Sequence, residues 1–119
     1  MSAMVPSVFA KELNELELQR TGPRANATAG EPVESEFELF NDGRVEVGVW
    51  ECTPGEFSSI KDGLTEEMLF LCGDATIIGD DGTEYEIAPG VLIVTPDGWK
   101  GRWDIRQTVR KVYTIWHTR

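Results

Sequence analysis

The chain has 119 residues, enough for one domain built around one hydrophobic core. Its 40% hydrophobic and 27% charged residues are typical of a globular protein, and the excess of 21 acidic over 11 basic residues argues against nucleic-acid binding. No apolar run is long enough for a transmembrane helix, and the N-terminus lacks the pattern of a secretory signal. We therefore expect a cytoplasmic protein that binds neither nucleic acid nor membrane. Cys52 and Cys72 lack metal-site spacing and are expected to be small buried residues.

Only residues 7–20 have helical periodicity. This segment places Val8, Leu13 and Leu16 on one side, and Ser7 could cap its start. Residues 21–35 are rich in Gly, Pro, Ala and Thr without periodicity, which predicts an irregular connection over the surface. Residues 1–35 are therefore predicted to form an N-terminal helical or irregular arm, with helix confined to about residues 10–16.

From residue 36 the pattern changes to short strands separated by turns. Turn signals occur at 41–44 (NDGR), 53–56 (TPGE), 80–84 (DDGTE) and 96–98 (PDG). Eight or nine strands at spacings of about 8 to 12 residues are typical of an all-β sandwich or barrel. Residues 36–119 are accordingly predicted to form one all-β domain.

Three segments, 66–73 (EEMLFLCG), 80–103 (DDGTEYEIAPGVLIVTPDGWKGRW) and 109–116 (VRKVYTIW), resemble a small single-domain cupin. With residues 48–57 (GVWECTPGEF), they are most similar to the subgroup related to the cupin domain of (S)-ureidoglycine aminohydrolase. The resemblance covers roughly residues 45–116. It implies a double-stranded β-helix, which is a jelly-roll barrel, and often a homodimer.

The second part of the cupin pattern is matched by Gly90, Pro96 and Gly98. Because Pro96 fixes φ and Gly98 tolerates a positive φ, these residues also predict a tight turn on physical grounds. Metal-binding cupins place a histidine in the following strand and an asparagine four residues later. Gly101 and Ile105 occupy these two positions here.

The first part of the pattern contains two histidines, a glutamate and a glycine. Glu66 and Gly73 match the last two, whereas the histidine positions fall at 60 and 62 or, with the longer spacing, at Ser59 and Lys61. One or two carboxylates, Glu66 alone or with Asp62, do not hold iron, zinc or manganese tightly. We therefore expect no metal ligand set and no cofactor.

Strand parity predicts an apolar pocket with one inward carboxylate. Residues two apart share a face, so Trp103 lies on the face of the missing histidine and Trp99 could form a lid. Glu66 shares its face with Met68 and Phe70. In such a pocket Glu66 would have a raised pKa and act as a general acid or base. A structural salt bridge to Lys61 or Arg102 is the alternative for Glu66, and simple core packing is the alternative for the tryptophans.

The C-terminal strand concentrates basic residues. Arg110 or Lys111 could bind a carboxylate or ureido oxygen, or could line a solvated strand face. His117 is expected to be a frayed surface residue. Glu66 is thus the candidate catalytic residue, and the candidate ligand-binding residues are Trp50, Met68, Phe70, Trp99, Trp103, Arg110, Lys111 and Tyr113.

Two functions from different classes remain open. The first is a small barrel without a tightly bound metal that binds a small polar metabolite in an apolar, tryptophan-lined pocket. The second, implied by the resemblance, is a metal-dependent hydrolase or related enzyme acting on a ureido or amino-acid-like metabolite. A homodimer is expected in either case.

Overall fold

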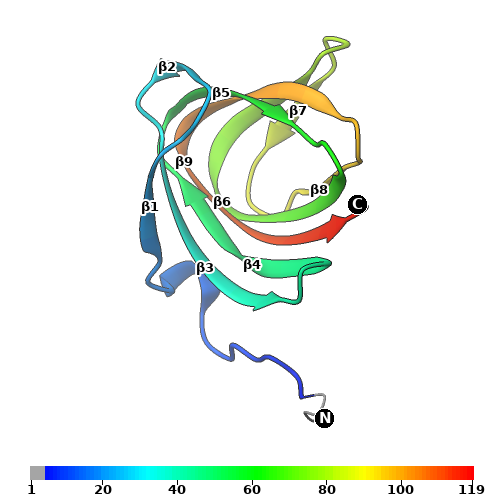
Figure 1. Cartoon of the computed structure of the whole chain (residues 1–119). Helices are drawn as coiled ribbons and strands as arrows, with labels where there is room; N and C mark the ends of the chain where they lie inside the picture. Colours follow the sequence, from blue (N-terminus) through cyan, green and yellow to red (C-terminus); the bar gives the residue numbers. More distant parts are fainter. Residues whose placement is uncertain (1–4) are drawn as a thin grey trace.

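A computed structural model describes residues 5–119 as one antiparallel sheet that curls into a barrel (Figure 1). The prediction of an all-β barrel is confirmed. A short 3-10 helix, η1 (Leu13–Glu15), precedes the strands. These are β1 (Gln19–Pro23), β2 (Ala27–Gly30), β3 (Val33–Asn41), β4 (Val45–Cys52), β5 (Gly55–Ile60), β6 (Leu64–Gly79), β7 (Glu84–Ile87), β8 (Leu92–Thr95) and β9 (Lys100–His117).

The two long strands β6 and β9 form the centre of the sheet. They pair with each other along most of their length, and the register shifts on both sides of Gly73. The other edge of β9 pairs first with β5 and then with β4, while the other edge of β6 pairs with β8 and β7. β6 therefore continues through Gly73 as one strand with an irregularity in its pairing. Gly73 has φ +107°, and a Cβ there would collide with Val109 of β9.

The turn predicted from Pro96 and Gly98 is present between β8 and β9. The backbone N–H of Trp99 donates to the carbonyl of Pro96 at 3.0 Å, and Gly98 has φ +91°. A positive φ at the third residue of such a turn is the conformation that favours glycine. This turn sets where β9 begins, and β9 carries Trp103, Lys111 and Tyr113.

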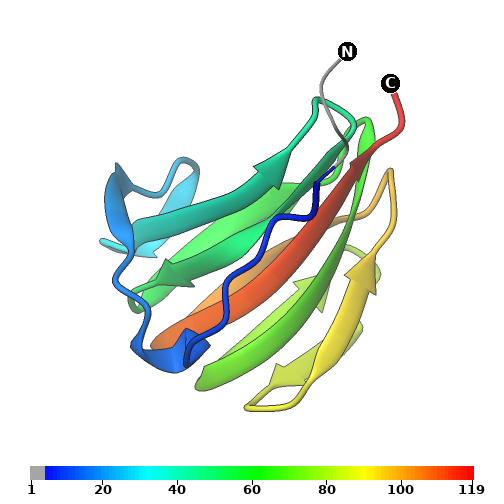
Figure 2. The same ribbon diagram turned by 90° about the horizontal axis from the view of Figure 1, so that it is seen from below.

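The N-terminal segment differs from its prediction in two ways. Residues 7–20 do not form a helix beyond η1; Phe9 instead packs against Phe37 of β3 at 5.7 Å between ring centroids. Residues 21–35 are not an irregular connection, because β1 pairs with β3 and β2 pairs with β5. A short helix is marginal unless it buries an apolar face. Here residues 5–12 lie extended along the outside of the sheet (Figure 2).

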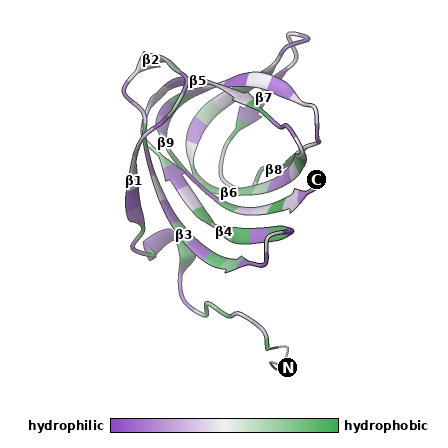
Figure 3. Cartoon of the chain, in the orientation of Figure 1, coloured by the Kyte–Doolittle hydropathy of each residue, from purple (hydrophilic) through white to green (hydrophobic). Residues whose placement is uncertain are grey.

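The inner face of the sheet holds the core. Hydrophobic and hydrophilic residues alternate along β3 and β4 (Figure 3), as expected for strands with one buried face. The core consists of Trp50, Cys52, Phe57, Met68, Phe70, Ala75, Ile77, Ile87, Trp103, Ile105, Val109 and Tyr113. Cys52 is buried as expected, and burial raises the pKa of its thiol to about 12; Cys72 is only half-buried. No helix within residues 5–119 is long and apolar enough to cross a membrane.

Candidate functional site

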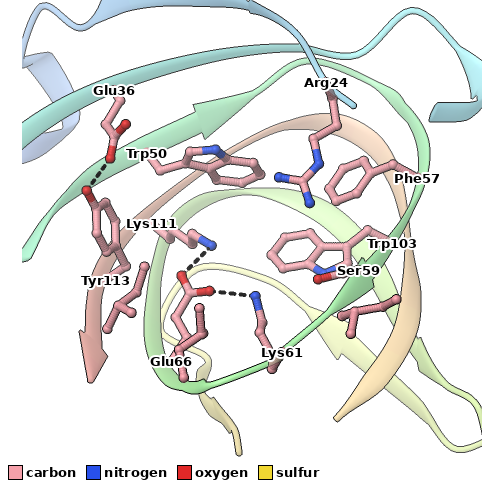
Figure 4. A pocket seen from close by; sticks show the side chains of 13 residues that line it. Arg24, Glu36, Trp50, Phe57, Ser59, Lys61, Glu66, Trp103, Lys111 and Tyr113 are labelled. Atoms are coloured by element: carbon pink, nitrogen blue, oxygen red, sulfur yellow. Dashed lines mark hydrogen bonds and ion pairs between the residues drawn. The ribbon is translucent and has the colours of Figure 1, made fainter. Parts of the chain in front are cut away.

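A cavity of about 220 Å³ lies on the inner face of the sheet (Figure 4). Its walls combine apolar rings with charged groups, and they come from five strands, from the segment between β1 and β2 and from the connection between β5 and β6. The lining residues are Arg24, Glu36, Trp50, Phe57, Ser59, Ile60, Lys61, Leu64, Glu66, Trp103, Lys111, Tyr113 and Ile115. A concave apolar site with a few converging polar groups is the usual form of a small-molecule site.

One buried carboxylate at the floor of the cavity is shared by two lysines. The Lys61 ammonium lies 2.7 Å from Oε1 of Glu66, and the Lys111 ammonium lies 2.8 Å from Oε2. Glu66 is on β6, Lys111 is on the neighbouring β9, and Lys61 is in the connection that leads into β6. Both oxygens of Glu66 are therefore held by cations, and its side chain is 5% exposed. The salt bridge between Glu66 and Lys61, which was the alternative for Glu66, is present in the structure, and Lys111 forms a second one.

The expected raised pKa of Glu66 is wrong. Burial favours the protonated form, but the charges of Lys111 and Lys61 outweigh it and lower the pKa of Glu66 to about 2. Glu66 is consequently a carboxylate at all physiological pH values and has no proton to donate. The pKa of Lys111 is lowered because burial disfavours its charge, although Glu66 opposes this effect.

Aromatic rings form the wall beside this cluster. The Trp103 ring stacks on Phe57 at 5.5 Å between centroids and meets the edge of Trp50 at 5.5 Å. Phe70 contacts Trp103 from below at 5.8 Å. The Lys111 ammonium lies 4.3 Å from the Trp50 ring centroid and 5.0 Å from that of Trp103. These cation–π contacts favour the charged form of a lysine that is otherwise desolvated.

Arg24 lies beside Phe57 of this wall, whereas Glu36 and Tyr113 line the opposite side of the cavity (Figure 4). The Arg24 guanidinium lies 4.3 Å from the Phe57 ring centroid and donates from Nη1 to Glu34 at 2.8 Å. Its Nε is buried and has no hydrogen-bond partner within residues 5–119. Tyr113 donates its hydroxyl proton to Glu36, and burial together with this carboxylate raises the pKa of Tyr113. The tyrosine therefore stays neutral.

Five of the nine candidate residues line the cavity, and two more lie beneath it. The lining five are Trp50, Glu66, Trp103, Lys111 and Tyr113. Met68 and Phe70 are buried under the floor, where the sulfur of Met68 lies 3.3 Å from the Lys111 ammonium. The alternation of β6 and β9 thus placed these residues on the inner face as parity predicted.

Arg110 and Trp99 lie outside the cavity, which corrects their expected roles. Arg110 donates from Nη1 to the carbonyls of Leu13 and Leu16 at 2.7 and 2.9 Å, and it pairs with Glu51. Its side chain therefore holds the N-terminal arm rather than a ligand. The Trp99 indole covers Gly101 and leaves no space for a side chain there, so it is not a lid over the cavity.

Two further expectations at the periphery are also corrected. Asp62 is exposed and pairs with Arg119, so it does not join Glu66 in a carboxylate pair. His117 is the last residue of β9, and its Nε2 lies 2.7 Å from Glu46. It is therefore held in place rather than frayed.

Sequence reasoning did not assign Arg24, Glu36, Ser59 and Lys61 to the site. For Ser59 and Lys61 a signal existed, since the longer spacing of the cupin pattern places its two histidines at these positions. Ser59 is buried whereas Ile60 is 61% exposed, so the structure selects that longer spacing. Arg24 lies in the segment between β1 and β2 and Glu36 lies on β3, and no local sequence pattern marked either residue.

These residues do not fit a tightly bound transition metal. Within residues 5–119 no three His, Cys, Asp or Glu side chains come together in a way that could hold a metal ion. The four positions that the cupin pattern assigns to ligands carry Ser59, Lys61, Glu66 and Gly101. Of these only Glu66 is a good ligand, and both its oxygens already bind ammonium groups.

A family model described as the EutQ-like cupin domain matches residues 39–113. The chain belongs to this family. The search of curated proteins found no match. Cupin folds of this kind occur both in proteins that bind small molecules and in proteins that bind metals.

Three solved structures illustrate the relationship. A DUF861-family protein of unknown function from Pseudomonas syringae pv. tomato is 23% identical over 86% of this chain, with a TM-score of 0.76. This chain spans only 45% of the length of that protein. The EutQ protein of Clostridium difficile is 21% identical, with 92% of this chain and 86% of that one covered and a TM-score of 0.71. A DUF861-family protein from Thermotoga maritima is 32% identical over 55% of this chain and 73% of its own length, with a TM-score of 0.52.

Proposed function

We propose that this cupin binds a small molecule in its tryptophan-lined cavity and that it does so without a tightly bound metal. The observation that carries the proposal is the pairing of both Glu66 oxygens with lysines, at 2.7 and 2.8 Å. Two ammonium groups supply the positive charge beside Glu66 that the cupin pattern otherwise assigns to a metal. A carboxylate neutralised in this way is a poor ligand for a further cation.

The cluster of Glu66, Lys61 and Lys111 is better suited to binding a ligand than to the catalysis that a bound metal would provide. An ammonium group offers three N–H donors, of which Lys61 uses one on Glu66. Unlike a metal, it has no open coordination position and does not activate a bound water. The remaining N–H donors, the Tyr113–Glu36 pair and the aromatic wall can orient a ligand by hydrogen bonds and ring contacts. The cavity of about 220 Å³ limits this ligand to a small metabolite.

The alternative is a metal-dependent hydrolase acting on a ureido or amino-acid-like metabolite. Its support is the resemblance of residues 45–116 to the ureidoglycine aminohydrolase subgroup and the presence of Glu66 at a ligand position of the cupin pattern. The other three positions argue against it. Ser59 is a weak ligand, Lys61 is a cation, and Gly101 has no side chain.

Metal analysis of the purified protein separates the two functions. Protein prepared without chelator and then equilibrated with manganese, iron and zinc salts should retain far less than one metal ion per chain after desalting. Stoichiometric retention of any of the three would overturn the metal-free proposal and favour the hydrolase.

Native mass spectrometry tests the binding function directly. We expect a small molecule that dissociates from the protein on denaturation, and a matched pair of variants locates it. Ser59→Leu adds bulk inside the cavity because Ser59 lines it, whereas Ser58→Leu adds the same bulk on the opposite face of β5. Loss of the bound molecule from both variants, or from neither, would contradict binding in this cavity.

A further inference from the structure

We propose that the ligand is a small monocarboxylate with a flat, apolar body, and that Arg24 is its main anchor. This inference rests on the proposed binding function and names the ligand class. Arg24 lies on the side of the cavity that faces the Glu66 cluster, and its guanidinium points toward the cavity (Figure 4).

The first argument is the balance of charge in the cavity wall. Three cations line the cavity, Arg24, Lys61 and Lys111, against two carboxylates, Glu36 and Glu66. Glu66 is used by the two lysines, and Glu36 accepts the proton of a tyrosine hydroxyl. The cavity wall therefore carries one more cation than carboxylates, because the partner of Arg24 is Glu34, which lies 2.8 Å away but does not line the cavity. This excess of positive charge at the wall favours an anionic ligand, although the protein as a whole carries a net charge of −10.

The second argument is the set of free donors on Arg24. Of its five N–H groups, one on Nη1 is used by Glu34, which does not line the cavity. The buried Nε–H has no acceptor within residues 5–119. The protein therefore uses only part of the hydrogen-bond capacity of this guanidinium, and the remaining N–H groups of Nη1 and Nη2 are available to an acceptor on a ligand. A guanidinium fork matches the two oxygens of a carboxylate, and the stacking of Arg24 on Phe57 fixes the plane of that fork.

The third argument is the shape of the wall between the two charged regions. Phe57 and Trp103 are stacked with an interplanar angle of 22°, and Trp50 meets Trp103 edge-on at 71°. Phe57 and Trp103 are almost fully buried, so the ring surface that remains open to a ligand is mainly that of Trp50, which favours a flat apolar body lying against it. Lys61 stands on the far side of the cavity with two N–H groups left over from Glu66, so it adds a second cation near the ligand.

Three probes of nearly equal size and different charge test the ligand class. Benzoate, benzamide and benzylamine carry charges of −1, 0 and +1 at neutral pH, and tryptophan fluorescence reports their binding because Trp50 and Trp103 line the cavity. We expect benzoate to bind at least about tenfold more tightly than benzamide, which is what one charge-assisted hydrogen bond contributes. Benzylamine should bind most weakly.

Variants of Arg24 test the anchor. Arg24→Gln should weaken benzoate binding about 10- to 100-fold and remove the preference for benzoate over benzamide. Arg24→Lys keeps the charge but loses the fork, so its affinity should lie between those of the wild type and Arg24→Gln. Arg20→Gln is the matched control, because Arg20 is an exposed residue of β1 that does not line the cavity. Circular dichroism of each variant verifies the fold, and Arg24→Lys carries the test should Arg24→Gln unfold.

The possible failures of the two proposals differ. Equal binding of benzoate and benzamide, or tighter binding of benzylamine, overturns the monocarboxylate class while leaving a small-molecule site. Unchanged benzoate affinity in folded Arg24→Gln and Arg24→Lys overturns Arg24 as the anchor. Absence of binding by all three probes, together with no molecule released from the native protein, overturns the binding function itself.

Discussion

Replacement of Glu66 by glutamine is the sharpest test of the charge cluster. The amide keeps the size of the side chain but leaves the ammonium groups of Lys61 and Lys111 in a buried site without a counter-charge. Breaking a buried ion pair by removing one partner costs about 3–5 kcal/mol of the free energy of unfolding. We expect a loss of this size at pH 7, measured by urea denaturation.

The pH dependence of that loss gives a second, independent magnitude. A carboxylate whose pKa is lowered on folding stabilises the protein above its unfolded pKa, and this stability disappears as the pH falls toward the folded pKa. For Glu66 these values are 4.5 and about 2, which corresponds to about 3 kcal/mol in total, of which about 2 kcal/mol is lost by pH 3. Because the glutamine variant lacks this group, its difference from the wild type should shrink by about 2 kcal/mol between pH 6 and pH 3.

Glu67→Gln is the control for both measurements. Glu67 is the next residue of β6, half-exposed and on the opposite face, so its replacement should change stability by less than about 0.5 kcal/mol. A loss below about 1 kcal/mol for Glu66→Gln at pH 7 would refute the reasoning, because the two lysines would then not depend on Glu66. A difference from wild type that stays constant with pH would refute the lowered pKa.

Three further predictions concern the wall, the histidine position and the assembly. Trp103→Ala should cost about 3–5 kcal/mol in chemical denaturation, because its ring is 2% exposed and packs against three aromatic residues; a loss below about 1 kcal/mol would reject this filling role. Gly101→His should not create tight metal binding in a metal-retention assay and should destabilise the fold, because a Cβ there collides with the Ile78 carbonyl and with Trp99. Light scattering should show a homodimer at micromolar concentration, because the outer face of β6 and β8 exposes three aliphatic side chains, Leu69, Leu92 and Val94. A clean monomer would contradict this prediction.

Strand periodicity and turn residues were enough to predict the barrel and the inner face of β6 and β9. A period of two is a local property, so the sequence alone placed Trp103 and Glu66 on the face of the pocket. For Lys111 it left two alternatives, a ligand contact or a solvated strand face. The arm could not be predicted in this way. In the extended arm Phe9 packs on Phe37 of the sheet while Val8 stays exposed, so the apolar residues of the helical pattern do not share one buried face. The strands at 19–23 and 27–30 depend on partners far along the chain.

The error on the pKa of Glu66 has a specific physical origin. Apolar neighbours at positions 68, 70 and 103 predict a desolvated carboxyl with a raised pKa, and burial does act in that direction. The sign of the shift is decided by Lys61 and Lys111, which lie 5 and 45 residues away in sequence but within 3 Å in space. Periodicity assigns a residue to a face but does not measure the distance between charges, so the outcome of two opposing effects was not accessible from the sequence.

The identity of the residue at position 61 also explains why one restored histidine would not make a metal site. Two unit charges about 4 Å apart at an effective dielectric constant of about 20 interact by about 4 kcal/mol, and a divalent cation doubles this repulsion. A metal placed beside Glu66 would face the ammonium groups of both Lys61 and Lys111. Even Lys61→His combined with Gly101→His would leave Lys111, which reaches Glu66 from β9 and is buried against Trp50. The proposed exclusion of a tightly bound metal therefore rests on two cations on different elements, and we expect that both must be removed before added imidazoles can act as ligands.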